Sequence, residues 1–166
     1  MINRRILMSG VAAGGALAAI GAVFGSRRPA VASSAGFEVT KSDAEWRRIL
    51  APGQYDVLRG HGTERAWSSP LEHEKRKGTF LCAGCDLPVY PSETKFDSGT
   101  GWPSFWKPLP NAVGTAEDNT LFTTRTEVHC RRCGGHLGHM FNDGPPPTGL
   151  RYCMNGVAMT FKPAVA

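Results

Sequence analysis

The chain has 166 residues, 41% hydrophobic and 20% charged, with 20 glycines and 12 prolines, a composition that predicts one globular domain with many turns and more strand than helix. Of the formal net charge of +5, +4 arises before residue 33, where four arginines stand without any acid; from residue 33 onward, 15 basic residues face 14 acidic ones. This near balance excludes the basic surface with which proteins bind nucleic acid phosphates.

The first 32 residues have the pattern of an export signal. A charged start precedes an apolar run over residues 6–24, and the small residues 30–32 (AVA) suit a cleavage site. Residues 3–8 (NRRILM) resemble a twin-arginine motif, which predicts export of the folded protein to the periplasm. The alternative is an uncleaved membrane anchor, but glycine and alanine make the run weakly hydrophobic. The expected division is a signal at 1–32 and a mature domain at 33–166.

Two short helices are expected at the start of the mature domain. Residues 42–45 (SDAE) form a capping box that predicts a helix to about Leu50, and Pro52 opens a second helical segment that ends near Gly60. The texture beyond is that of a mainly β protein. Segments rich in strand-forming residues follow at 79–81, 120–129, 150–155 and 157–161. Residues 91–119 are polar and lack apolar periodicity, which predicts a loop that carries the functional site.

Four of the five cysteines form two Cys-x-x-Cys pairs: Cys82 with Cys85, and Cys130 with Cys133. The two-residue gap lets both sulfurs of a pair point at one metal ion, so four cysteines predict a closed, tetrahedral structural zinc site. Two disulfides are the alternative. A Cys-x-x-Cys disulfide closes a very short loop and stabilises little, so the pattern favours zinc.

The fifth cysteine, Cys153, is a candidate nucleophile, although a single cysteine is more often a small buried hydrophobe. If residues 150–155 form a strand, Arg151, Cys153 and Asn155 project from one face, and the apolar residues Leu150, Tyr152 and Met154 project from the other. A guanidinium beside the sulfur favours the thiolate. We therefore expect the pKa of Cys153 below the ~8.5 of a free cysteine.

Three residues upstream of Cys153 are candidate proton donors. His136, His139 and Asp143 carry groups that can protonate a departing oxygen when their pKa is suitable. The residues alone leave open which of the three acts.

Five ordered motifs between residues 40 and 163 resemble the peptide-methionine (R)-S-oxide reductases: 82–85 (CAGC), 94–105 (TKFDSGTGWPSF), 136–141 (HLGHMF), 143–145 (DGP) and 147–155 (PTGLRYCMN). The resemblance implies two antiparallel sheets with short N-terminal helices, a four-cysteine structural zinc and Cys153 as the attacking thiol. It also implies two substrate-binding residues: Trp102, which packs against the substrate methyl group, and His136. It assigns supporting roles to a set of site residues, which are His136, His139, Asp143, Arg151 and Asn155.

The chain departs from this family at Thr100, where many members hold a second, resolving cysteine. All five cysteines already have a role, so no internal disulfide can form without dismantling the zinc site. We therefore expect a sulfenic acid on Cys153 that a thioredoxin-like protein or a small thiol reduces directly. The substrates would be oxidised proteins or peptides, and the protein is expected to be a monomer.

The competing hypothesis is a zinc-ribbon module without enzymatic activity, which binds a partner. Zinc ribbons usually separate their cysteine pairs by about 15–20 residues. Here 44 residues intervene, and such a module would leave Trp102 and Cys153 without a role. The sequence therefore favours the enzyme.

Overall fold

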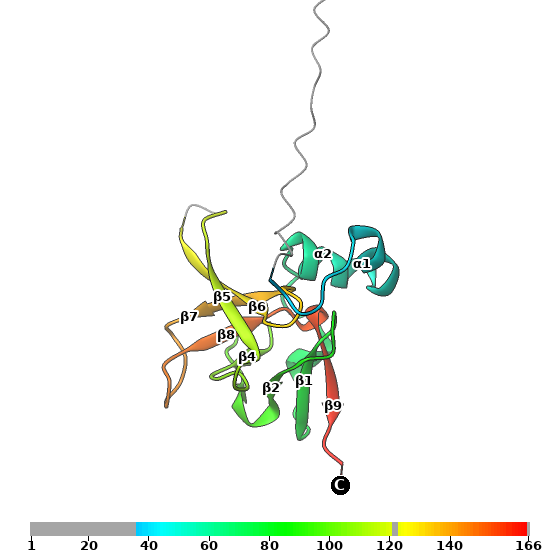
Figure 1. Cartoon of the computed structure of the whole chain (residues 1–166). Helices are drawn as coiled ribbons and strands as arrows, with labels where there is room; N and C mark the ends of the chain where they lie inside the picture. The colour runs from blue at the N-terminus through cyan, green and yellow to red at the C-terminus, as the bar shows by residue number, and fades with distance from the viewer. Residues whose placement is uncertain (1–35, 121–122, 166) are drawn as a thin grey trace, which may run out of the picture.

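The computed structural model describes residues 36–120 and 123–165 and has a mainly β fold with two antiparallel sheets and two short helices, as predicted. Figure 1 shows the helices at one end of the molecule and the C-terminal strand at the other. The export signal expected at 1–32 lies outside the described residues and stays a prediction. Among the residues that the structure describes, no helix combines the length and the apolar character that crossing a membrane requires.

Both helices begin and end close to the predicted residues. Helix α1 (Asp43–Ile49) starts at the capping box, in which the Ser42 hydroxyl accepts from the Glu45 N–H and the Glu45 carboxylate accepts from the Ser42 N–H. Helix α2 (Pro52–Gly60) has proline in its first turn. Its C-cap is His61, whose left-handed backbone (φ 56°) ends the helix. The buried helical residues are Trp46, Val57 and Leu58.

The smaller sheet has the order β2-β1-β9, formed by β1 (Gly78–Cys82), β2 (Pro88–Pro91) and β9 (Met159–Pro163). The strand predicted at 79–81 is therefore correct. The one predicted at 157–161 begins later, because a 3-10 turn (Gly156–Ala158) precedes β9. That turn places Ala158 beside the first cysteine pair, where its carbonyl accepts from the Ala83 N–H at 2.9 Å.

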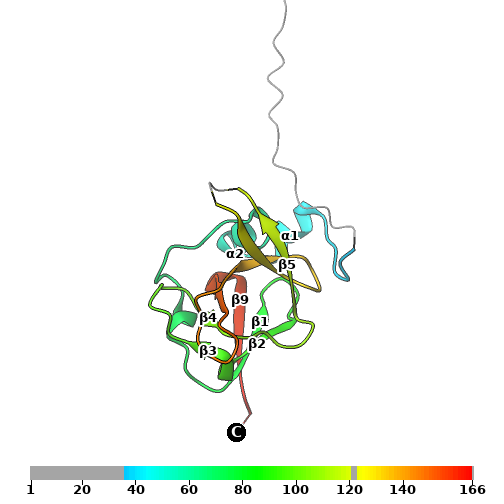
Figure 2. The same ribbon diagram turned by 90° about the vertical axis from the view of Figure 1, so that its left-hand side faces the viewer.

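The larger sheet has six strands in the order β3-β4-β8-β7-β6-β5. Its members are β3 (Lys95–Phe96), β4 (Ser104–Phe105), β5 (Val113–Asp118), β6 (Arg125–Cys130), β7 (His136–Phe141) and β8 (Arg151–Met154). In Figure 2, β3 and β4 lie beside β1, β2 and β9, whereas β5 extends toward the end that carries the helices.

The loop predicted at 91–119 is wrong in part, since β3, β4 and β5 lie within it. β3 and β4 have two residues each, too few to show a period, and β5 is a largely exposed edge strand without apolar alternation. Pairing with neighbours, rather than local sequence, forms these strands. The strand predicted at 120–129 starts only at Arg125, and neither β2 nor β7 was expected.

The core lies where the two sheets meet. The rings of Tyr90 on β2 and Phe105 on β4 stack with centroids 4.3 Å apart, and Phe80 on β1 meets Phe105 edge to face at 4.9 Å. The Tyr90 hydroxyl donates to the Met154 sulfur at 3.1 Å. These contacts attach the smaller sheet to β4 and β8, the strands that carry the site described below.

We expect Phe80→Ala to lower the free energy of unfolding by roughly 3–5 kcal/mol, because it leaves a cavity between the sheets. Phe80 has no exposed surface and contacts both Phe105 and Phe161. Urea denaturation followed by fluorescence measures the change. Ile49→Ala is the control, since that side chain is 50% exposed and should cost little. Equal effects of the two substitutions would contradict this description of the core.

Candidate active site

Cys153 lies on β8, which is an inner strand of the larger sheet. β8 pairs with β4 on one side and β7 on the other, which places Ser104 and His139 directly opposite Cys153. The predicted alternation is confirmed, because Tyr152 packs on the core and Met154 is fully buried in it. Cys153 projects from the opposite face of the sheet.

A small cavity of about 130 Å³ opens over the Cys153 thiol. Segments distant in the sequence form its wall, and the lining residues are Thr63, Trp102, Arg125, Gly138, His139, Phe141, Cys153 and Asn155. Four of the residues singled out in the sequence therefore meet here: Cys153, Trp102, His139 and Asn155. The other three, His136, Asp143 and Arg151, stand outside this wall.

The pKa of Cys153 differs from the expectation. Burial raises it above the ordinary value for a cysteine, and this effect exceeds the opposing influences of the Thr100 hydroxyl and the Arg151 guanidinium. The Thr100 hydroxyl lies 3.8 Å from the sulfur. The expectation considered only the neighbouring cation, as the sequence does not reveal how deeply the sulfur is buried.

Hydroxyl groups line the space behind the thiol, and the sequence reasoning missed them. The Ser98 hydroxyl lies 2.8 Å from that of Thr100 and 2.7 Å from that of Ser104, which also donates to the Trp102 carbonyl at 3.1 Å. Ser104 is fully buried opposite Cys153. Serines in a glycine-rich segment give no signal of their own. Only the pairing of β4 with β8 brings them to the sulfur.

Arg151 and Asp143 form a bidentate ion pair, with both nitrogen-to-oxygen distances at 2.8 Å. The guanidinium also lies over the Phe141 ring, 4.4 Å from its centroid. The Asp143 side chain is 62% exposed, whereas that of Arg151 is only 11% exposed. Asp143 therefore orients Arg151 beside the site and does not itself line the cavity.

His139 is held by a carboxylate that the sequence reasoning missed. Nε2 of His139 donates to Asp118 at 2.7 Å, which places the proton of the neutral ring on Nε2. Burial lowers the pKa of His139, although Asp118 acts in the opposite direction. The pKa of Asp118 is itself below the ordinary range, first because the Thr120 hydroxyl donates to it, with further help from His139 and Arg125.

Arg125 is a second missed residue. It lines the cavity and donates to Asp118 at 2.6 Å, and the two residues are partners in the β5–β6 pairing. Neither Asp118 nor Arg125 belongs to a recognised motif, so nothing in the sequence pointed to them. A reliable pairing register would have found them.

His136 is buried next to the cavity but does not line it. Its Nδ1 lies 2.8 Å from a Glu127 carboxylate oxygen, and its ring centroid lies 5.2 Å from that of His139. Because His136 does not line this cavity, its contact with the substrate stays a prediction. His136 supports His139 from behind.

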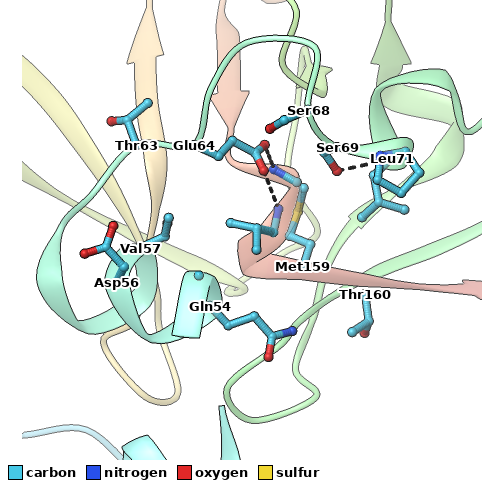
Figure 3. A pocket seen from close by; sticks show the side chains of 14 residues that line it. Gln54, Asp56, Val57, Thr63, Glu64, Ser68, Ser69, Leu71, Met159 and Thr160 are labelled. Atoms are coloured by element: carbon cyan, nitrogen blue, oxygen red, sulfur yellow. Dashed lines mark hydrogen bonds between the residues drawn. The ribbon is translucent and has the colours of Figure 1, made fainter. Parts of the chain in front are cut away.

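The segment after α2 closes the other side of the site. Asn155 accepts from the Glu64 N–H at 3.0 Å and donates to the Leu137 carbonyl at 3.2 Å. The Glu64 carboxylate accepts from the N–H groups of Gly156 and Val157, as the dashed lines of Figure 3 show. The Trp102 indole donates to the Glu64 carbonyl at 3.1 Å. Glu64 thus fixes two walls of the cavity, Trp102 and Asn155.

A larger cavity of about 470 Å³ adjoins Glu64 on its far side, between α2 and β9. Figure 3 shows mixed polar and apolar side chains around it, among them Gln54, Leu71 and Met159. Neither Cys153 nor another cysteine lines it. Cys153 lines the smaller cavity and not this larger one.

The other four cysteines gather at the helical end of the sheets. Their sulfur atoms all lie within 4.8 Å of one another, with 3.7 Å between Cys82 and Cys133 and 3.5 Å between Cys85 and Cys130. A disulfide needs about 2.05 Å, and the edge of a zinc–sulfur tetrahedron with 2.3 Å bonds is about 3.8 Å. The arrangement fits one tetrahedral metal ion and not two disulfides.

Comparison with known proteins agrees with this geometry. The SelR domain family matches residues 50–163, a range that contains every described strand of both sheets. A peptide methionine sulfoxide reductase MsrB of Agrobacterium fabrum is 55% identical over 127 residues, which cover 76% of this chain and 94% of that protein. One from Methanosarcina barkeri is 52% identical over 125 residues, covering 75% and 88%.

The fold and the site define the class of protein: a mainly β oxidoreductase with a single thiol in its cavity. Within that class, the chain belongs to the peptide methionine sulfoxide reductase MsrB family. Membership of an enzyme family excludes the alternative of a zinc ribbon without activity.

The thiol of Cys153 should react with iodoacetamide with a pH midpoint above ~8.5, since burial disfavours the thiolate. Arg151→Gln removes a cation that lowers this pKa, so its rate curve should move to still higher pH. Mass spectrometry of the peptide that contains Cys153 measures the rate at each pH. Arg48→Gln, an exposed change on α1, should leave the curve in place. A midpoint below that of free cysteine would contradict the conclusion that burial raises the pKa of Cys153.

Proposed function

We propose that this protein reduces the R epimer of methionine sulfoxide in proteins and peptides, with Cys153 as the nucleophile. The observation that carries the proposal is the small cavity in which the Cys153 thiol, the Trp102 ring and His139 converge. Reduction of methionine sulfoxide is the activity of the family to which the chain belongs. The finer assignments below concern this chain's own residues.

The reaction starts with attack of the Cys153 sulfur on the sulfur of the sulfoxide. The S=O bond breaks, the oxygen passes to Cys153, and one proton is taken up and one released, so that the products are methionine and a sulfenic acid on Cys153. Burial raises the pKa of the free Cys153 thiol, and the Arg151 guanidinium acts in the opposite direction by favouring the nucleophilic thiolate.

His139 is the proposed proton donor to the departing oxygen. It lines the cavity opposite Cys153, and Asp118 stabilises the protonated ring once it forms. Asp143 is not suited to this step, because it is paired with Arg151 and lies outside the cavity wall. The geometry therefore favours one of the three donors considered from the sequence.

The preference for the R epimer follows from the two kinds of wall. Trp102 offers an aromatic surface for the substrate methyl group, while Arg125 offers polar hydrogens for the oxygen, joined by His139 when its ring is protonated. Inverting the sulfoxide exchanges the methyl group and the oxygen. The oxygen of the S epimer then lies against the Trp102 ring, and the polar side of the cavity is left without a hydrogen-bond partner. An unsatisfied polar contact of this kind costs about 1–3 kcal/mol, enough for strong discrimination.

Turnover is proposed to use direct reduction of the sulfenic acid by a thioredoxin-like protein or a small thiol. Two external thiols become a disulfide, the sulfenic oxygen leaves as water, and Cys153 returns to the thiol. On the glycine-rich loop, the Thr100 hydroxyl lies 3.8 Å from the Cys153 sulfur, and a threonine cannot form a disulfide. The remaining cysteines are gathered in the separate cluster.

The four-cysteine cluster is proposed to bind one structural zinc ion. The donor set and the sulfur separations fit tetrahedral zinc, and the two pairs come from turns that belong to different sheets. When bound, zinc would link the turn after β1 to the turn between β6 and β7. The ion takes no part in the chemistry at Cys153.

We also propose that the protein works after export, as a monomer that repairs oxidised proteins outside the cytoplasm. The twin-arginine pattern of residues 3–8 supports this location, and that route would carry the domain already folded with its metal. Cell fractionation should find the protein outside the cytoplasm, and its mass should be that of a mature chain that begins at Ser33.

With a racemic, blocked methionine sulfoxide and dithiothreitol, the protein should consume the R epimer and leave the S epimer, as read by chiral chromatography. Cys153→Ser should lower the rate by at least about 10³-fold, since the nucleophile is removed. Circular dichroism and metal content of that variant should match the unmodified protein. Equal loss of both epimers, or an active Cys153→Ser protein, would refute the proposed function.

Cys85→Ser should release the metal and lower the melting temperature by many degrees, because a structural zinc site couples binding to folding. Atomic emission gives the zinc content, and calorimetry gives the melting temperature. Cys153→Ser serves as the matched control and should keep both. A Cys85→Ser protein with undiminished stability would remove the case for structural zinc.

Thr100→Cys should create an internal disulfide with Cys153 after one turnover, because the Thr100 hydroxyl already lies 3.8 Å from the sulfur and a disulfide needs about 2 Å. The unmodified protein should instead keep a sulfenic acid that dimedone traps. The control Thr115→Cys adds an exposed thiol on the distant edge strand β5 and should form no such bond. A peptide map that joins Cys153 to a cysteine of the zinc cluster would contradict direct reduction.

A further inference from the structure

A second cluster of metal-ligand side chains adjoins His139 but shares no residue with the lining of the Cys153 cavity or with the four cysteines. It consists of His61, Glu127 and His136, whose ligand atoms all lie within 4.8 Å of one another. Two imidazoles and a carboxylate form a donor set that zinc and related divalent transition metals bind well.

The distances within this His61–Glu127–His136 cluster suit a metal ion. One carboxylate oxygen of Glu127 lies 2.8 Å from Nδ1 of His136 and 3.1 Å from Nδ1 of His61. With zinc-to-ligand bonds of about 2.0–2.1 Å, the edge of a tetrahedron is about 3.3 Å, so shifts of a few tenths of an ångström would admit the ion. The rings of His61 and His136 are stacked with centroids 5.1 Å apart, which presents both Nδ1 atoms to the same oxygen.

The fold holds two of these ligands firmly and leaves the third at the surface. Glu127 on β6 and His136 on β7 are 12% and 1% exposed, whereas the His61 side chain is 45% exposed. His61 is the left-handed cap of α2, which lies against β7. An ion would therefore enter from the solvent on the His61 side and keep a coordination position open there.

The nearby cation does not occupy the same space. Arg59, in the last turn of α2, donates to the Cys133 carbonyl at 3.0 Å and lies 5.0 Å from the Trp46 ring centroid. Its charge is thus directed toward α1 and the cysteine cluster. The only carboxylate within the cluster is that of Glu127, so one bound divalent ion with two neutral imidazoles would carry a local charge of about +1.

We propose that His61, Glu127 and His136 form an exchangeable binding site for a divalent transition metal of the zinc class. The alternative explanation of the same geometry is a proton-bridged cluster, in which each Nδ1–H donates to Glu127 and no ion binds. The two explanations differ in metal content. They also differ in whether added metal shifts the NMR signals of the Nδ1 atoms of both histidines.

The experiment uses the full-length protein with Cys153→Ala, which removes the one thiol outside the cysteine cluster. Equilibrium dialysis against zinc in a thiol-free buffer, followed by atomic emission, counts the ions per chain. We compare this protein with His61→Asn, whose asparagine tolerates the left-handed backbone of the helix cap, and with Glu127→Gln. His73→Asn, an exposed histidine outside the cluster, is the matched control.

We expect His61→Asn and Glu127→Gln each to hold about one zinc ion per chain fewer than the parent, and His73→Asn to equal the parent. Nitrogen NMR of the histidine rings should show that zinc shifts Nδ1 of His61 and His136 and leaves His73 unchanged. Equal zinc in the parent and His61→Asn, or unmoved Nδ1 signals, would overturn the proposal. Because the result is a difference between variants, it does not depend on occupancy of the four cysteines, and His61→Asn decides if Glu127→Gln fails to fold.

Discussion

The position of β8 between β4 and β7 is the constraint on which the site depends. Antiparallel pairing fixes Cys153 opposite both Ser104 and His139, and a shift by one residue would turn the thiol into the core. The aromatic contacts of Phe80, Tyr90 and Phe105 behind β4 and β8 hold that register. The core therefore positions the nucleophile as well as stabilising the fold.

Burial of Cys153 has two consequences that oppose each other. It protects the sulfur within a small cavity, and it raises the pKa of the thiol, which disfavours the reactive form. Arg151 and Thr100 act against this penalty. The orientation of Arg151 rests in turn on its bidentate pair with Asp143, an exposed residue outside the cavity. The reactivity of the sulfur thus depends on residues that need not touch the substrate.

Helix α2 and the segment after it connect the separate parts of the molecule. Arg59 contacts the cysteine cluster at the Cys133 carbonyl, His61 contacts Glu127 on the larger sheet, and Glu64 binds the turn after Asn155. These contacts follow one another within a few residues of chain. This one segment therefore contacts the cysteine cluster, the larger sheet and the turn beside the cavity.

The sequence by itself determined the local and covalent features: the capping box at Ser42, the proline start of α2, the two cysteine pairs and the alternation around Cys153. Each follows from neighbouring residues. Only the tertiary structure decided the short strands β3, β4 and β5, the partners Asp118 and Arg125, and the direction in which the pKa of Cys153 is displaced. Strand register and burial arise from contacts between distant segments, and no local pattern encodes their geometry.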